Sequence, residues 1–427
     1  MSDRTFKKRN EAGEIIENLQ APAGESCCVD SGQKQEHVFK EQENPLPKMP
    51  SADFALSLTE WFNREKRMLP WREDKDPYHI WVSEIMLQQT AIAVVKDYYR
   101  RFMAELPDLQ HLSQCDDERL MKLWEGLGYY SRVRNMKKAA CIITEKGEKN
   151  LPADYKELLS LPGIGNYTAG AISSIAFGIR RPAVDGNVLR VLSRLAGSYA
   201  DNMLPATKKF YEEKLQDLME RNPSIHPGDL NEGLMELGEV ICIPNGKPLC
   251  EKCPLQGMCI SYRDNLTECL PVRIVKTKRR IEKKTVFVIE YDKRVAVRKR
   301  KNKGLLSGLY EFPNVEGHLK KEEALSYILS LIEGMEKSES KEKEEQQIEK
   351  NKEAAENDPA IVIEELPETK HLFSHIEWRM TGYYVKLSCE ADIPGVLWAE
   401  RTEVEKKYAI PGAFEIYRQF WMNIPKN

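Results

Sequence analysis

The chain has 427 residues, a formal net charge of −3, 31% charged residues and ten cysteines. This length exceeds what one hydrophobic core supports, which predicts two or three domains. The near-neutral total gives no global sign of nucleic-acid binding, although the charge is unevenly distributed along the chain. We find no run of about 18 apolar residues and therefore expect neither a membrane-spanning helix nor a membrane partner.

Residues 1–50 are polar, contain scattered Gly and Pro and lack periodicity, which predicts a disordered N-terminal tail. The first residues lack the apolar stretch of a secretory signal, so we expect none. In a chain that is not exported, ten cysteines favour metal ligands or reduced thiols over disulfides. We therefore expect a cytoplasmic protein.

From Ser51 onward, apolar residues recur at the i, i+4, i+7 and i+8 spacing of an amphipathic helix: Phe54, Leu58, Trp61 and Phe62. Ser51 is a plausible N-cap for this helix. Helical patterns with Gly and Pro between them continue to about residue 262, without clear β alternation. These patterns predict an all-α domain over residues 51–270.

One segment of this domain, residues 161–168, has the sequence LPGIGNYT and is followed by a helical pattern. Leu-Pro ends the preceding helix, and Gly163 and Gly165 permit a turn that is closed to a Cβ atom. The first amides of the next helix would point outward at an anion such as a DNA phosphate. Residues 155–180 thus form a candidate helix-hairpin-helix, although this turn alone indicates no more than an ordinary helix corner.

Four cysteines follow the spacing C-x7-C-x2-C-x5-C near the end of the helical domain: Cys242, Cys250, Cys253 and Cys259. Structural zinc sites usually have two paired knuckles. A single pair flanked by two separate cysteines suits a [4Fe–4S] cluster better. Four unliganded thiols are a poor alternative at this density. We predict one [4Fe–4S] cluster; Cys269, ten residues further on, fits no pair.

Residues 271–284 contain seven Lys or Arg and one Glu, which predicts a basic linker that is either simply solvated or contacts the DNA backbone. Strand patterns follow in TVFVIEY and RVAVRKR, and a helical pattern lies near the C-terminus. They predict an α+β domain over residues 285–427. A charged, low-complexity insertion interrupts it at residues 336–358.

Two carboxylates of the helical domain have contrasting surroundings. Glu84 lies among Trp81, Ile85 and Leu87, which should raise its pKa and favour the neutral acid. Asp185 lies in a Gly-bearing loop before a helix and is expected to stay ionised. An acid paired with an anion is what cleavage through an oxocarbenium ion requires. Taken singly, each residue is better explained as a helix cap or a surface group.

These features together resemble the adenine DNA glycosylases of the MutY family, within the helix-hairpin-helix base-excision superfamily. The matching strings lie between about residues 60 and 380: LPWREDKDPY, WVSEIMLQQT, LWEGLGYYSRVRN, LPGIGNYTAGA, PAVDGNV, NEGLMELGEVIC and FSHIEW. The resemblance implies an all-α helix-hairpin-helix glycosylase domain with an iron–sulfur cluster loop, followed by an α+β Nudix-like domain. It also implies a monomer of bacterial type at the nucleoid. This monomer would remove undamaged adenine opposite 8-oxoguanine or guanine in double-stranded DNA.

The resemblance also implies roles for single residues. Glu84 is then the general acid that protonates N7 of adenine, and Asp185 stabilises the cationic sugar. Tyr167 should lie beside Asp185 and help to position it. Adenine must leave the base stack to react. The positions that line the family's adenine pocket are Arg67, Trp71, Arg72, Leu87 and Glu232.

Further matches concern DNA and the lesion. Gln89 and Tyr129 match residues that enter the duplex, Tyr129 as a wedge near the oxidised guanine. Without the resemblance, core packing would be the better explanation for Tyr129. The trio that contacts the lesion matches Phe373, Ser374 and His375. Because oxidation turns guanine N7 into an N–H donor, the Ser374 hydroxyl can accept a bond that guanine cannot offer.

Tyr167 also separates two chemistries. Related bifunctional glycosylases of the endonuclease III type have LPG-x-G-x-K here, and their lysine attacks the sugar. A phenol cannot form the imine, which predicts a monofunctional enzyme that leaves an abasic site. One rival is a bifunctional enzyme that acts on oxidised pyrimidines. The other is a non-catalytic lesion-binding protein or Fe–S redox sensor.

The chain departs from the family pattern at two points. Seven residues separate the first two cluster cysteines, where the family commonly has six. The C-terminal domain contains no REx2EE-type metal box, so we expect no Nudix hydrolysis.

Overall fold

The computed structural model describes residues 45–274, 279–301, 303–332 and 361–425, and also the backbone of two short paired strands, β1 (Lys8–Arg9) and β2 (Ile15–Ile16). Apart from these strands, residues 1–44 of the predicted tail lie outside the described residues. So do the predicted insertion 336–358 and residues 275–278 of the predicted linker.

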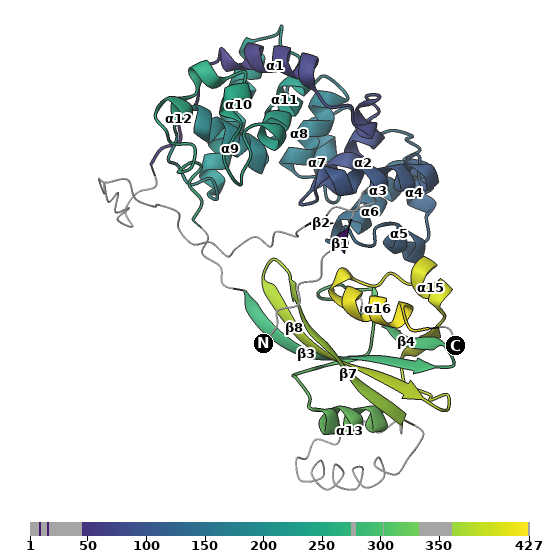
Figure 1. The fold of residues 1–427 in the computed structure, drawn as a ribbon. Coiled ribbons are helices and arrows are strands. Elements are labelled where there is room, and N and C mark those ends of the chain that lie inside the picture. Colours follow the sequence, from purple (N-terminus) through teal and green to yellow (C-terminus); the bar gives the residue numbers. More distant parts are fainter. Residues whose placement is uncertain are drawn as a thin grey trace, which may run out of the picture. The chain divides into compact units, whose positions relative to one another are not determined.

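The predicted all-α domain is present (Figure 1). Its helices are α1 (Phe54–Glu65), η1 (Pro70–Arg72), α2 (Pro77–Leu87), α3 (Ile92–Glu105), α4 (Leu109–Gln114), α5 (Asp117–Leu123), α6 (Ser131–Glu145), α7 (Tyr155–Ser160), α8 (Asn166–Ile175), α9 (Gly186–Leu195), α10 (Pro205–Arg221), α11 (Pro227–Val240), η2 (Cys250–Lys252), η3 (Gln256–Met258) and α12 (Ile260–Arg263).

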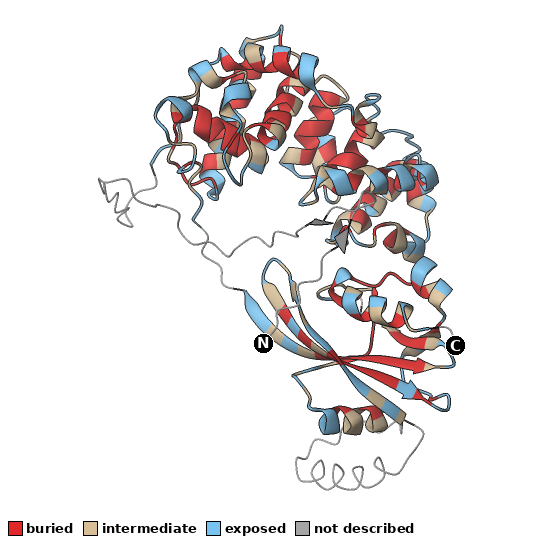
Figure 2. Ribbon diagram, in the orientation of Figure 1, coloured by how far each residue is buried: buried red, intermediate tan, exposed pale blue. Residues whose placement is uncertain are grey.

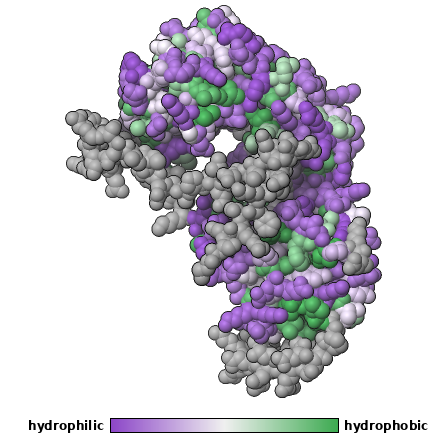
Figure 3. Space-filling view, in the orientation of Figure 1, coloured by the Kyte–Doolittle hydropathy of each residue, from purple (hydrophilic) through white to green (hydrophobic). Residues whose placement is uncertain are grey.

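Two apolar cores hold these helices together. One contains Trp81, Phe102 and Trp124, from α2, α3 and the end of α5. The other contains residues of α1, α9, α10 and α11, and the buried residues of α9 and α11 are red in Figure 2. Met235 packs against both cores. Hydrophilic side chains cover most of the visible face of the described residues (Figure 3).

The C-terminal domain is the predicted α+β domain. It contains β3 (Arg280–Tyr291), β4 (Arg294–Lys299), β5 (Tyr310–Glu311), β6 (Asn314–Glu316), α13 (Lys321–Ile332), β7 (Ile361–Leu372), β8 (Ile376–Leu387), β9 (Val396–Ala399), α15 (Arg401–Lys406), η4 (Gly412–Phe414) and α16 (Glu415–Met422). The seven-stranded sheet has the order β5-β4-β3-β8-β7, with β6 on β3 and β9 on β4. It is mixed, because β3 and β8 run parallel and the other pairs run antiparallel.

Helices cover both faces of this sheet. Val286 and Val288 pack on the side of α16, and Phe287 and Ile289 pack on the side of α13. Successive side chains of a strand point to opposite faces, so the stretch of β3 that is buried on both sides, Val286–Ile289, is apolar at consecutive positions. β3 begins at Arg280, so the last five residues of the predicted linker are already strand, paired with β8 from Ile376 onward.

Candidate active site

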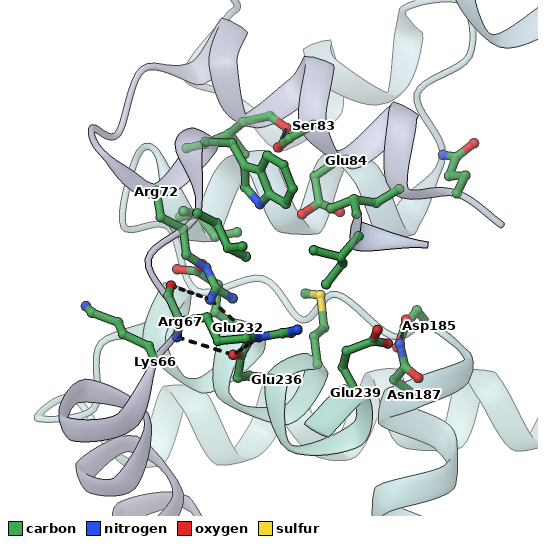
Figure 4. A pocket seen from close by; sticks show the side chains of 18 of the residues that line it. Lys66, Arg67, Arg72, Ser83, Glu84, Asp185, Asn187, Glu232, Glu236 and Glu239 are labelled. Atoms are coloured by element: carbon green, nitrogen blue, oxygen red, sulfur yellow. Dashed lines mark hydrogen bonds and ion pairs between the residues drawn. The ribbon is translucent and has the colours of Figure 1, made fainter. Parts of the chain in front are cut away.

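Segments of η1, α2, α8, α11 and the start of α9 surround a cavity of about 910 Å³ (Figure 4). Its wall includes every residue predicted for catalysis and for the adenine pocket: Arg67, Trp71, Arg72, Glu84, Leu87, Tyr167, Asp185 and Glu232. Gln89 lies on the same wall. Residues separated by as much as 165 positions therefore meet at one concave surface, the usual form of a small-molecule site.

Glu84 lies on α2, which begins with Asp76 as N-cap and Pro77 in its first turn. Its side chain is nearly enclosed, with the residue 7% exposed. Burial raises the pKa of Glu84 to about 7. The hydroxyl of Tyr167 donates to Oε2 at 2.6 Å and opposes this shift, while the charge of Glu232 adds to it. Near neutral pH, the acid and its anion are thus both populated.

Asp185 is the N-cap of α9. Its Oδ1 accepts from the Val188 amide at 2.8 Å, and its Oδ2 accepts from Nδ2 of Asn187 at 3.0 Å. Burial raises the pKa of this carboxyl, whereas the hydrogen bonds from Val188 and Asn187 lower it. The donors favour the anion. The helix-cap explanation is therefore correct, and it is compatible with a place on the cavity wall.

Tyr167 lies in the first turn of α8, and its partner differs from the expected one. Its hydroxyl contacts Oε2 of Glu84 at 2.6 Å and the sulfur of Met235 at 3.2 Å, instead of bonding to Asp185. Burial and then the charges of Glu84 and Asp185 hold the pKa of Tyr167 well above its usual value. The phenol therefore remains protonated and acts as a donor to Glu84.

Two arginines and two glutamates form a hydrogen-bonded network on the cavity wall (Figure 4). Glu236 accepts from Nε and Nη2 of Arg67 at 2.5 and 3.0 Å and from Nη1 of Arg72 at 3.0 Å. Arg72 also donates through Nε to Glu232 at 2.8 Å. Sequence reasoning missed Glu236; its place one helical turn after Glu232 could have indicated it.

α9 joins the cavity wall to the cysteine segment. Its Arg190 is buried and donates to Oδ1 of Asn187 and to the carbonyl of Cys242, both at 2.8 Å. Asn187 in turn holds Asp185. Neither Asn187 nor Arg190 was a predicted site residue, although both follow Asp185 in DGNVLR.

The four predicted cysteine ligands line one small cavity of about 30 Å³, together with Arg194: Cys242, Cys250, Cys253 and Cys259. All four are free. Burial raises the pKa of the Cys250, Cys253 and Cys259 thiols, to about 12 for Cys253. Within the described ranges, no group of three or more His, Cys, Asp or Glu is placed to hold a metal ion. Cys269 is exposed.

The predicted hairpin lies between α7 and α8. Gly163 has a φ of 79°, and a Cβ there would lie 2.7 Å from Cβ of Asn135, so this position requires glycine. The same argument was wrong for Gly165. Its φ is −98°, and a Cβ would point into open space among the described residues. Gly165 is instead the N-cap of α8, which leaves the first amides of that helix without a side-chain cap.

Two of the predicted DNA-contacting residues adopt the left-handed backbone region, Gln89 with φ 59° and Tyr129 with φ 45°. Residues other than glycine are rare in this region and are often found at functional sites. Tyr129 is 47% exposed, so core packing does not explain it. Its hydroxyl lies 2.6 Å from that of Ser374.

The predicted lesion trio lies where β7 turns into β8. The ring of Phe373 packs edge-on against Trp378 and His371, at centroid distances of 4.9 and 4.7 Å. Ser374 and His375 are exposed at the turn. The aromatic contacts thus anchor a loop that presents the Ser374 hydroxyl.

Comparisons with known proteins agree with this geometry. Residues 82–221 match the model of the HhH-GPD superfamily of base excision DNA repair proteins, and residues 285–419 match the NUDIX domain. An adenine DNA glycosylase of Buchnera aphidicola is 37% identical over 62% of this chain and 76% of its own length. That of Rattus norvegicus is 31% identical over 91% of this chain and 83% of its own length. The chain belongs to the adenine DNA glycosylase family.

Membership of the adenine DNA glycosylase family confirms the predicted enzyme class, a hydrolase of N-glycosyl bonds, and the predicted Nudix-like nature of the C-terminal domain. Among solved structures, a thermostable thymine-DNA glycosylase is 31% identical over 50% of this chain and 96% of its own, with a TM-score of 0.45. The helices of the described residues include none that is long and apolar enough to cross a membrane.

Proposed function

We propose that this enzyme excises adenine paired with 8-oxoguanine or guanine in duplex DNA and leaves an abasic site, as a monomer at the nucleoid. The observation that carries the proposal is the arrangement of Glu84, Tyr167 and Asp185 around one cavity. A carboxyl group with a pKa of about 7 lies on this cavity wall together with Asp185, whose charged form is favoured by hydrogen bonds from Val188 and Asn187 although burial raises its pKa. Such a pair supplies an acid and a cation-stabilising charge at the same pH.

Glu84 is the proton donor in this mechanism. Because the Tyr167 hydroxyl donates to Oε2, the proton is carried by Oε1, which is free to reach N7 of adenine. Protonation turns the departing base into a neutral molecule, and general acids of this kind contribute roughly 10²–10⁴-fold to a rate. Asp185 faces the positive charge that develops on the sugar until water captures C1′.

Adenine reaches this cavity only after it leaves the base stack. Trp71 and Leu87 provide apolar surface for the purine ring, and Glu232 provides a carboxylate beside it. Gln89 and Tyr129 then occupy the duplex near the vacated position. An exposed aromatic ring replaces a lost stacking partner, and the fixed left-handed backbone of Tyr129 aims its ring outward.

Preference for the oxidised guanine is assigned to Phe373, Ser374 and His375. The Ser374 hydroxyl, which pairs with Tyr129 in the protein alone, would exchange this partner for the N7–H of 8-oxoguanine. This lesion loop, residues 373–375 between β7 and β8, binds unmodified guanine less well. The N7 atom of guanine accepts a hydrogen bond and cannot donate one to Ser374.

We propose that the four cysteines hold a [4Fe–4S] cluster, although no group of three or more such side chains among the described residues is placed to hold a single metal ion. They form an all-thiol donor set around one small cavity, and burial favours the neutral thiols of Cys250, Cys253 and Cys259 unless a cation stabilises the thiolates. When bound, the cluster would cross-link the loop between Cys242 and Cys259. Purified protein should contain about four irons and absorb in the visible thiolate-to-iron region. Zinc in place of iron would contradict this assignment.

A strand-cleavage assay tests the reaction. Duplexes with adenine opposite 8-oxoguanine should yield a broken strand only after alkali, because Tyr167 offers no amine to open the sugar. Borohydride should trap little enzyme on DNA. Breakage without alkali, with high-yield trapping, would support the bifunctional rival. Binding without adenine release would support the lesion-binding protein.

A further inference from the structure

Glu236 is the most heavily bonded carboxylate of the cavity wall. Besides the guanidinium groups of Arg67 and Arg72, it accepts from the backbone amide of Arg67 at 3.3 Å. Its side chain is only 2% exposed, against 15% for Arg72 and 34% for Arg67. The segment that leads into η1 is thus attached to α11 through one enclosed anion.

The charges of the network formed by Arg67, Arg72, Glu232 and Glu236 balance. Arg67 and Arg72 contribute two positive charges, and Glu232 and Glu236 contribute two negative charges when ionised. The hydrogen bonds from Arg67 and the charge of Arg72 lower the pKa of Glu236 despite its burial, so it stays ionised where Glu84 titrates. Removing its charge would leave one net positive charge in this network, which lines the same cavity as Glu84.

We propose that Glu236 is a positioning residue that holds Arg67 and Arg72 in a charge-balanced network and thereby keeps Glu84 able to donate its proton near neutral pH. The inference rests on the proposed function. It extends that function to a residue that touches neither adenine nor the sugar and acts through the two arginines.

The groups that face Glu84 determine how this effect is transmitted. They are Tyr167 from α8, Glu232 from α11, Asp185 at the start of α9 and Arg72 from η1. Arg72 is the cation among them and favours the Glu84 anion. Glu236 binds Nη1 of this same guanidinium and offsets part of its charge. Neutralising Glu236 therefore strengthens the attraction of Arg72 for the Glu84 anion, and Glu84 then loses its proton at a lower pH.

The test measures single-turnover adenine release from pH 5.5 to 8.5 for the full-length protein and Glu236→Gln. Wild-type rates should fall above about pH 7 as Glu84 loses its proton. In the variant, this alkaline limb should move about one pH unit lower, which makes the rate about tenfold lower at pH 8 and within about twofold of wild type at pH 5.5.

Three further variants separate charge from packing. Glu65→Gln neutralises an exposed, ion-paired carboxylate on α1 and should leave the limb in place. Glu236→Asp keeps the charge and should retain the wild-type limb even with a lower rate. The double variant Arg72→Gln with Glu236→Gln also removes the cation that Glu236 no longer offsets, so its limb should move back toward the wild-type position.

A uniform loss of rate at every pH in Glu236→Gln, with the limb at its wild-type position, would overturn the inference and leave Glu236 with a purely structural role. The inference would also be overturned if the alkaline limb of the double variant stayed at the position found for Glu236→Gln. Failure of the proposed function is distinct, because wild-type protein itself would then release no adenine.

Discussion

The active cavity and the lesion loop place polar side chains in opposite environments. Glu84 is 7% exposed, and burial raises its pKa to about 7. Ser374 is exposed at a turn between strands, where its hydroxyl lies 2.6 Å from that of Tyr129. Burial changes the pKa of a titratable group, whereas an exposed hydroxyl only exchanges one hydrogen bond for another when it binds a ligand. We therefore expect changes in the cavity to have large effects and changes in the loop to have small ones.

The largest effect is expected from Glu84→Gln. Glutamine keeps the shape and can still accept from Tyr167 but has no acidic proton, so single-turnover adenine release should fall about 10³-fold. DNA affinity, measured by electrophoretic mobility shift, should change by less than about threefold. Adenine release at the wild-type rate would remove the assigned role of Glu84.

The same carboxyl should affect stability. Its folded pKa of about 7 exceeds the unfolded value of about 4.3, so its contribution is fully present below pH 4 and is lost as pH rises through 7. Between pH 5 and 8.5 the loss amounts to about 3 kcal/mol. Urea unfolding should therefore show that Glu84→Gln gains stability relative to wild type as pH rises. Parallel pH profiles of the two proteins would contradict the enclosed-acid description.

The smallest effect is expected from Ser374→Ala. The loss of one exposed hydroxyl should reduce the preference for 8-oxoguanine over guanine about three- to tenfold, which corresponds to about 1 kcal/mol. Excision opposite guanine should stay within about twofold of wild type. Ser326→Ala, on the exposed face of α13, is the matched control. An undiminished preference would mean that another group reads the lesion.

The sequence was sufficient for the domain classes, because apolar spacing differs between helices and buried strands. The start of β3 was not predictable in this way. Arg280, Lys283 and Lys284 are charged, and they belong to a strand only because β8 lies beside them. Partners distant in sequence determine such boundaries.

Within the site, motif residues indicated which side chains meet but not how they pair. The direction of the Tyr167 hydroxyl depends on how α8 packs against α2, and this packing turns it to Glu84. Glu236 is one of three glutamates of α11, with Glu232 and Glu239, and its contact with Arg67 from a distant loop distinguishes it. Such roles arise from tertiary packing.

Asp185 caps α9 through the same two oxygens that are proposed to face the cationic sugar. Asparagine can also cap a helix, so Asp185→Asn should fold and retain the lesion loop while it lacks the charge. Such a protein would occupy mismatches without clearing them and would shield them from other repair. Cellular quality control acts on misfolded proteins and would therefore not remove the Asp185→Asn protein. In a cell that also makes the normal protein, the variant would compete with it for the same DNA sites.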